Sequence, residues 1–337
     1  LAVVMQADGL LDNQMQAKWT QGRLAHVLLM GFDYRGSRSA IQAADGPAPS
    51  IDIFNPVYGA AVTPPDLYEN SKTRASQLGL YAQDQIKLDK RWVFLLGGRW
   101  DQARSTKDES VYDTRTTQRD KAFTGRVGSV YLFDNGFAPY ASYSTSFIPE
   151  IGTTAAGNAF KPTRGRQFEV GFRYQPPGGG GVFSAAVFDL TQQNVLTVDP
   201  NDINARIQTG EIRSRGFQLE QKLSVSREVN VAASYTYMDA RITRSNDGVQ
   251  GNRVGAVPRH AAAVWADYKP RSELLRGFSI GAGARFSGRT PVADTNVYSL
   301  PARTLLDALV RYEWQKYTFS LKVTNLLDKK FVSQCGS

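Results

Sequence analysis

The chain has 337 residues, of which 42% are hydrophobic and 21% charged, and its formal net charge is +9. It is too apolar for a disordered protein and too poor in Gly and Pro for a fibrous one. Its apolar runs, such as residues 92–98, are much shorter than the roughly 18 residues of a membrane-spanning helix, so helical membrane proteins are excluded.

Hydrophobic residues recur with a period of two along most of the chain, which indicates β-strands. In residues 14–21, for example, Met15, Ala17 and Trp19 share one face and polar residues fill most of the other. No segment shows a convincing 3.6-residue period of an amphipathic helix. About 14 strands are predicted, at residues 10–22, 24–38, 73–89, 91–106, 119–134, 136–148, 165–176, 181–193, 211–224, 228–242, 259–269, 277–289, 302–314 and 317–325.

The connections between these strands alternate between short and long. Short ones lie at residues 22–23, 89–90, 134–136, 176–178, 224–227, 270–276 and 314–316. Long polar ones lie at residues 39–72, 107–118, 149–164, 194–210, 243–258 and 290–301. Outer-membrane barrels have tight periplasmic turns and long extracellular loops. The pattern therefore predicts an all-β fold, an antiparallel transmembrane β-barrel.

The two faces of the predicted strands fit this fold. In such barrels the apolar face meets lipid and the polar face meets the lumen. Ser142 and Ser144 would point inward and Tyr143 outward. Asp84 falls on the apolar face of its strand, which we interpret as a β-bulge or a position outside the bilayer.

Aromatic residues gather near the predicted strand ends, as they do in the interfacial girdles of membrane barrels. The ordinary preference of aromatic residues for strands is the alternative explanation. The residues concerned are Trp92, Trp100, Tyr131, Phe133, Tyr140, Phe147, Tyr174, Tyr237, Trp314 and Tyr317.

Cysteine and histidine are too rare for several common kinds of site. The single cysteine excludes a disulfide scaffold and a Cys-based zinc site, and His26 and His260 show no metal-ligand spacing. The 40 Lys and Arg residues are scattered rather than clustered in stripes, and no nucleic-acid-binding motif accompanies them. The sequence therefore predicts neither a metal site nor a nucleic-acid partner.

The sequence gives little support to an enzyme. His-Glu-x-x-His and Gly-x-x-x-x-Gly-Lys are absent from it. The Gly-rich residues 277–288 are predicted to form a strand, and a strand does not make a phosphate loop. We therefore predict that the protein is not an enzyme.

Several stretches carry a family resemblance through their order and spacing. They are Leu80-Tyr-Ala-Gln-Asp-Gln-Ile86, Leu95-Leu-Gly-Gly-Arg-Trp-Asp101 and residues 26–34, 138–147, 168–172, 194–200, 208–217, 233–237 and 324–332. Together they span nearly the whole chain. The sequence resembles the C-terminal barrel of TonB-dependent siderophore receptors, those of the ferrichrome and ferrioxamine type in particular.

The resemblance implies a 22-stranded barrel with a plugged lumen. On that basis residues 1–337 are expected to be one partial barrel domain, with about seven strands before Leu1 and one after Ser337. The N-terminal plug and its energy-coupling box are also expected before Leu1. Receptors of this type often carry a cysteine pair in the last extracellular loop, which implies a partner for Cys335 beyond Ser337. An incidental free thiol is the alternative for this cysteine.

The resemblance also implies that a ferric siderophore is captured at the extracellular mouth. Iron would enter only as part of this ligand, and no cofactor is expected. Aromatic rings and hydrogen-bond donors of the long loops and upper strand ends are the candidate contacts. They are Tyr34, Tyr58, Tyr68, Trp100, Arg104, Tyr112, Phe147, Phe160, Arg241 and Tyr298. For each of them, loop packing or interfacial anchoring is the alternative role.

We therefore expect an outer-membrane receptor of a Gram-negative bacterium that imports a ferric siderophore with energy supplied through TonB. The basic charge suits the phosphates of outer-leaflet lipopolysaccharide, and it also suits an anionic siderophore. The alternatives are a TonB-dependent receptor for cobalamin, haem or a glycan, a passive porin-like channel, and a soluble all-β enzyme.

Overall fold

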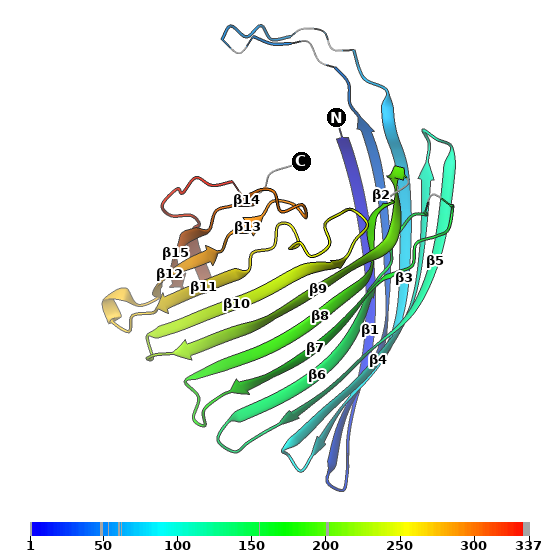
Figure 1. The fold of residues 1–337 in the computed structure, drawn as a ribbon. Helices are drawn as coiled ribbons and strands as arrows, with labels where there is room; N and C mark the ends of the chain where they lie inside the picture. The colour runs from blue at the N-terminus through cyan, green and yellow to red at the C-terminus, as the bar shows by residue number, and fades with distance from the viewer. Residues whose placement is uncertain are drawn as a thin grey trace.

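The computed structural model describes residues 2–47, 50–52, 54–59, 61, 63–154, 156–199 and 202–332, and Figure 1 shows the fold. Cys335 and its expected disulfide lie outside these residues. Among the described residues, no helix is both long enough and apolar enough to cross a membrane.

Within the described ranges, fourteen long strands form one antiparallel sheet, and each strand pairs with the next one along the chain (Figure 1). They are β1 (Ala2–Gln21), β2 (Leu24–Ala44), β3 (Leu67–Leu88), β4 (Trp92–Glu109), β5 (Thr114–Tyr131), β6 (Phe137–Ile148), β7 (Thr163–Tyr174), β8 (Gly181–Asp199), β9 (Asp202–Ser224), β10 (Val229–Arg244), β11 (His260–Tyr268), β12 (Phe278–Ser287), β15 (Arg303–Trp314) and β16 (Tyr317–Val323). The predicted antiparallel strands are confirmed.

The sheet curves strongly but does not close within the described part of the chain, where β1 and β16 are its two edges (Figure 1). A separate hairpin of β13 (Thr290–Pro291) and β14 (Ser299–Leu300) lies in the connection between β12 and β15. One 3₁₀ turn, η1 (Glu273–Leu275), lies between β11 and β12.

The tight turns lie at one end of the sheet, as predicted, because consecutive connections of an antiparallel sheet alternate between its ends. Asp89 and Lys90 both adopt positive φ angles, 51° and 62°, which a type I′ hairpin turn requires at its two central residues. The Arg23 guanidinium of the neighbouring turn donates hydrogen bonds to the Asp89 carboxylate, and this interaction lowers the pKa of Asp89.

Two of the predicted long loops are wrong. Most of residues 107–118 belong to β4 and β5, and most of residues 194–210 belong to β8 and β9. The extensions of β4 and β5 carry polar residues on both faces, so no hydrophobic period marks them, whereas Ile203, Ala205 and Ile207 of β9 alternate with polar residues in the sequence. The backbone groups of these extensions continue the hydrogen-bonded ladders, because unpaired groups would cost free energy.

The side chains sort into an apolar face and a polar face. Cross-strand partners share a face of a sheet, and the exposed hydrophobic residues of successive strands are such partners. The apolar face includes Leu80, Leu96, Val127, Phe168, Val170, Val187, Val264, Ile280, Leu306, Val310, Phe319 and Leu321. Ser142 and Ser144 lie on the polar face, as predicted, and Tyr143 packs against Phe168 on the apolar face with ring centroids 4.5 Å apart.

A belt of aromatic rings crosses the apolar face near the tight turns. Trp92 of β4 contacts Tyr131 of β5, and Tyr131 contacts Phe133 beyond it, with centroids 4.8 and 4.6 Å apart. The belt continues through Phe137 to Phe172, 5.0 Å apart. Contacts between rings of successive strands favour an interfacial girdle over a simple strand preference.

Asp84 contacts a histidine on the neighbouring strand. The predicted bulge at Asp84 is wrong, because the β2–β3 and β3–β4 ladders run through this residue without a shift in register. Its Oδ2 lies 2.7 Å from Nδ1 of His26, and the two side chains are only 22% and 14% exposed. Trp19 stacks on the His26 ring with centroids 4.7 Å apart. This pair gives Oδ2 of Asp84 a partner on the apolar face, where Leu28 and Leu96 flank the carboxylate, whereas its Oδ1 is buried without a hydrogen-bond partner.

The His26→Leu substitution is expected to lower the stability of the protein by about 2–3 kcal/mol, because it leaves the Asp84 carboxylate unpaired among apolar side chains. The double substitution His26→Leu and Asp84→Leu is expected to restore stability to at least the wild-type level, because it removes the whole pair. Gel electrophoresis measures both effects on thermal stability, because the folded barrel migrates faster than the unfolded chain. The temperature above which this faster band is lost is compared between the variants. A double variant no more stable than the single one would contradict this explanation.

Candidate functional site on the polar face

Three carboxylates lie in one row on the polar face. Asp12 of β1 is the direct cross-strand partner of Asp33 on β2, and Asp33 is the partner of Gly79 on β3. Gly79 in turn pairs with Asp101 on β4. Like charges directly opposite each other destabilise a sheet, so this row needs a counter-charge.

Arg99 of β4 supplies that charge. Its Nη2 donates to Oδ1 of Asp33 over 2.9 Å and to Oδ1 of Asp101 over 2.7 Å. Its Nε donates to Oδ2 of Asp101 over 2.8 Å. Asp101 is only 1% exposed and also accepts a hydrogen bond from Nε2 of Gln77, at 2.8 Å. The Arg99 clamp therefore ties β2 to β4 across the intervening strand.

Two glycines allow these side chains to lie flat on the sheet. A Cβ atom at Gly79 would overlap the Arg99 guanidinium, and one at Gly31 would lie 2.5 Å from the Tyr81 hydroxyl. That hydroxyl donates to Oδ1 of Asp12 over 3.1 Å, and the Arg99 guanidinium lies 5.8 Å from the Tyr81 ring centroid. The glycines therefore fix the position of the clamp.

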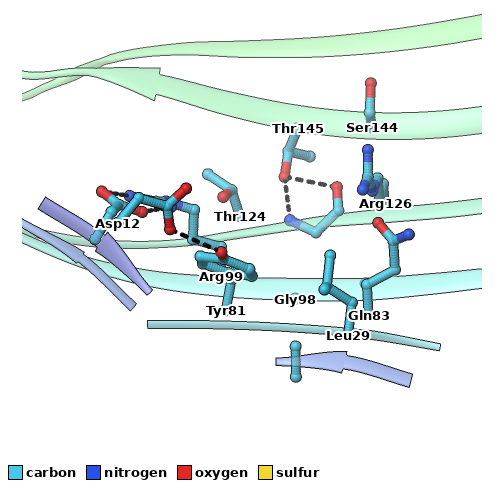
Figure 2. A pocket seen from close by; sticks show the side chains of 14 residues that line it. Asp12, Leu29, Tyr81, Gln83, Gly98, Arg99, Thr124, Arg126, Ser144 and Thr145 are labelled. Atoms are coloured by element: carbon cyan, nitrogen blue, oxygen red, sulfur yellow. Dashed lines mark hydrogen bonds and ion pairs between the residues drawn. The ribbon is translucent and has the colours of Figure 1, made fainter. Parts of the chain in front are cut away.

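Beside the clamp is a hollow of about 520 Å³, shown in Figure 2. It extends from Asp12 to the point where the β5–β6 ladder stops at the pair of Arg126 and Ser144. One step beyond, the Gly125 N–H donates to Oγ1 of Thr145 over 2.9 Å, so a side chain replaces the missing backbone acceptor (Figure 2). Arg126 lines the hollow and forms no hydrogen bond or ion pair with any described residue.

The Arg99 clamp and the hollow beside it hold charged side chains and amide groups at fixed positions. A polar partner on this face of the sheet could contact them. Within the described residues, no group of three or more His, Cys, Asp and Glu side chains is placed to hold a metal ion. The clamp is not among the predicted site residues, although charged residues in the middle of strands are a signal for it. The row exists only through the strand register, which sequence periodicity does not reveal.

The residues predicted to contact ligand are dispersed, and none of them lines this hollow. By strand register, five lie on the apolar face: Tyr34, Trp100, Arg104, Phe147 and Arg241. Tyr68 lies at a shift in the β2–β3 register, and Phe160 is buried with its carbonyl accepting from Gln118 Nε2 at 2.8 Å. Tyr58, Tyr112 and Tyr298 are 81%, 68% and 75% exposed in connections at the long-loop end.

A second hollow, of about 670 Å³, lies on the long-loop part of the apolar face. Arg38 of β2 is the direct partner of Arg74 on β3, and Arg104 of β4 is the direct partner of Arg119 on β5. None of these four arginines forms a hydrogen bond or ion pair with a described residue. Two adjacent like-charge pairs without counter-ions make this surface suited to an external anion.

Comparison with known proteins identifies the class as an outer-membrane β-barrel and then the family. The family described as "TonB dependent receptor-like, beta-barrel" matches residues 4–326. The chain is 39% identical over 333 residues to a ferrioxamine B receptor of Salmonella typhimurium, covering 97% of this chain and 47% of that protein. It is 38% identical to the ferrichrome outer membrane transporter/phage receptor of Escherichia coli, covering 96% of this chain and 45% of that protein. The chain belongs to the β-barrel family of TonB-dependent receptors.

The chain spans about half the length of the curated relatives it matches. Solved structures share its fold at lower identity. The siderophore receptor PiuA of Acinetobacter baumannii superposes with a TM-score of 0.81 at 21% identity, over 98% of this chain and 53% of that one. A ferripyoverdine receptor of Pseudomonas aeruginosa superposes with a TM-score of 0.79 at 20% identity, over 99% and 46%. In this family the polar face is the wall of the lumen and the apolar face meets lipid.

The Arg99→Met substitution in the full-length receptor is expected to destabilise the barrel by about 3 kcal/mol, because it leaves the buried Asp101 and its neighbour Asp33 without a counter-charge. Gly79→Ala is expected to act in the same direction by displacing the guanidinium. The matched control is Arg126→Met, which removes an arginine of the same face that has no described partner. Unfolding in urea, followed by tryptophan fluorescence, measures the difference; equal stabilities of the two Arg variants would refute the clamp.

Proposed function

We propose that this chain forms part of the barrel of an outer-membrane receptor that imports a ferric siderophore with energy supplied through TonB. The observation that carries the proposal is the 39% identity with a ferrioxamine B receptor, which extends over 97% of the chain. The polar lumen wall supports it, because a large hydrophilic ligand needs fixed hydrogen-bonding groups along its path. Iron is cargo within the ligand, and the chain needs no cofactor of its own.

The extracellular mouth is the proposed capture site. Of the ten predicted contacts, Tyr58, Tyr112 and Tyr298 are the ones that project from connections at the long-loop end with most of their surface exposed. Rings in such positions can cover the apolar parts of a siderophore while their hydroxyls contact its polar groups. The residues on the apolar face have no such access, since they point away from the lumen.

The full-length receptor is expected to bind a ferric hydroxamate such as ferrioxamine B or ferrichrome tightly, and to bind cobalamin and haem weakly or not at all. Replacing Tyr58, Tyr112 or Tyr298 with Ser is expected to weaken siderophore binding by about threefold to tenfold per residue, from the loss of one aromatic contact. Quenching of intrinsic fluorescence measures the affinities. The control is Tyr317→Ser, at the tight-turn end of the sheet.

Two results would contradict this function. Tight binding of cobalamin, haem or a glycan, with no binding of any ferric siderophore in the panel, would assign a different nutrient. Steady ion conductance of the full-length protein in a planar bilayer would favour the passive porin-like channel.

Lipopolysaccharide is the proposed lipid partner of the second hollow. Arg38, Arg74, Arg104 and Arg119 lie on the lipid-facing surface toward the long-loop end, where phosphates of the outer leaflet would neutralise them. Tyr34 lines the same hollow. Its ring can therefore serve as an interfacial anchor beside these arginines.

The double substitution Arg38→Gln and Arg74→Gln is expected to reduce the lipopolysaccharide that copurifies with the full-length receptor by about tenfold, because it removes one complete cross-strand pair of cations. Siderophore affinity is expected to stay unchanged. The control variant is Arg91→Gln at the tight-turn end, where Nη2 of Arg91 is paired with Asp134 at 2.8 Å. Equal amounts of bound lipopolysaccharide in all three proteins would refute this assignment.

A further inference from the structure

Two connections at the long-loop end of the sheet are joined to each other by hydrogen bonds. They are residues 245–259, between β10 and β11, and residues 288–302, between β12 and β15, and we call them the loop pair. Nδ2 of Asn252 donates to the carbonyl oxygen of Asp294 over 2.9 Å, and the Gly255 N–H donates to Oδ1 of Asp294 over 2.7 Å. These partners are separated by 42 and 39 residues in the sequence, so tertiary contacts rather than local turns hold the loop pair.

The backbones of the loop pair approach each other most closely at Gly255 and Ala256. A Cβ atom at Gly255 would lie 2.8 Å from the backbone of Ala293, so a larger residue does not fit there. Ala256 adopts a φ angle of 58°, which is unfavourable for a residue with a Cβ atom. Its N–H donates to the carbonyl oxygen of Pro291 over 2.8 Å. Such strain persists only where the surrounding contacts enforce it, so the backbone of the loop pair is fixed.

Asn296 joins the two connections through its side chain. Its Oδ1 accepts a hydrogen bond from the Arg253 N–H over 3.0 Å, and its Nδ2 donates to the Arg253 carbonyl oxygen over 2.7 Å. The side-chain amide therefore pairs with the backbone of Arg253 as a neighbouring strand would. Nδ2 also lies 3.0 Å from the carbonyl oxygen of Ala293, within its own connection. Asn296 has a φ angle of 57°, a conformation that asparagine adopts more readily than most other residues.

The residues that follow Asn296 project from this fixed backbone. Val297 and Tyr298 are 70% and 75% exposed, although both side chains are largely apolar. The Val292 N–H donates to the carbonyl oxygen of Tyr298 over 3.0 Å, which ties the backbone below the ring to the β13–β14 hairpin. The loop pair therefore presents an exposed aromatic ring from a backbone that is already ordered.

The other two exposed tyrosines of the long-loop end have only local support among the hydrogen bonds of the described residues. Near Tyr58, the N–H groups of Phe54 and Asn55 donate to Oδ1 of Asp52, at 2.8 and 3.3 Å, within the same connection. Beside Tyr112, the N–H of the preceding residue donates to a carboxylate two positions earlier, over 3.3 Å. Tyr298 differs from both because its backbone is tied to a second connection.

We propose that the loop pair is a preorganised platform of the extracellular mouth, on which Tyr298 contacts the siderophore and Asn296 is the positioning residue that holds it. A ring fixed in advance loses less conformational freedom on binding than a ring on a free loop, so more of the contact energy appears as affinity. The ligand class that fits is a ferric siderophore whose apolar linkers can pack against the ring. The inference rests on the proposed receptor function and adds to it a residue that touches no ligand itself.

The test is Asn296→Gly in the full-length receptor, because glycine keeps the positive φ angle without strain and removes only the side-chain amide. Binding of ferrioxamine B, measured by quenching of intrinsic fluorescence, is expected to weaken by about threefold to fivefold. In the Tyr298→Ser background the same substitution is expected to change the affinity by less than about twofold, because it acts through that ring. The control is Asn230→Ala at the tight-turn end, where Oδ1 of Asn230 accepts from Oγ of Ser224 at 2.8 Å.

Hydrogen exchange supplies a second measurement that needs no ligand. Asn296→Gly is expected to speed exchange of the Arg253 N–H by about tenfold or more, since it removes the acceptor of that group. Asn296→Asp keeps this acceptor and loses the donor to the Arg253 carbonyl, so its exchange rate and its siderophore affinity are expected to lie between those of the wild type and Asn296→Gly.

Three results would overturn the inference. They are an unchanged siderophore affinity in Asn296→Gly, an effect of Asn296→Gly that is equally large with and without the Tyr298 ring, and an unchanged exchange rate at Arg253. The first two are read in a receptor whose wild type binds the siderophore, so they leave the proposed function intact. A wild-type receptor that binds no ferric siderophore would instead contradict the proposed function and the platform together.

Discussion

The backbone hydrogen bond is the interaction on which the whole structure depends. Hydrocarbon offers no partner for an N–H or C=O group, so each strand that crosses it must pair with its neighbours. The sheet obeys this even where its ladders are interrupted. Pro139 lacks an N–H, and it lies just outside the β5–β6 ladder, which runs only from Tyr140 to Ser144 on the β6 side. At the other end of that ladder, the hydroxyl of Thr145 accepts the hydrogen bond of Gly125.

The continuous ladder imposes the alternation of faces, and the alternation decides where charge can lie. A strand cannot turn one side chain to the other face without a bulge. The charged residues within the bilayer are therefore confined to the polar face, where Arg99 joins Asp33 and Asp101, or they are paired on the apolar face, as His26 and Asp84 are. The register brings these partners together from strands that are separated by up to 66 residues in the sequence.

The alternation of side chains between the two faces also explains which features could be predicted from the sequence. The period of two is strong where one face meets lipid, and there the predicted strands agree with the sheet to within a few residues. It disappears in the polar extensions of β4 and β5, which the sequence therefore predicts to be a loop. The carboxylate row of Asp12, Asp33 and Asp101 depends on the relative positions of four strands, and a single-residue slip would abolish it. Likewise, chemical type alone marks bulky and basic residues as candidate ligand contacts, whereas strand parity decides whether they have access to the lumen.

The arginines of the apolar face follow from the same constraint. A β-sheet places residues of neighbouring strands directly opposite each other, so Arg38 and Arg74, or Arg213 and Arg241, cannot avoid one another by changing rotamer alone. In a soluble protein water and salt would screen such pairs. At the edge of a bilayer that screening is weaker, and a stable barrel then requires either carboxylates, as around Asp189, or anions fixed in the adjacent leaflet. The distribution of charge on this face is therefore matched to an anionic lipid surface rather than to water.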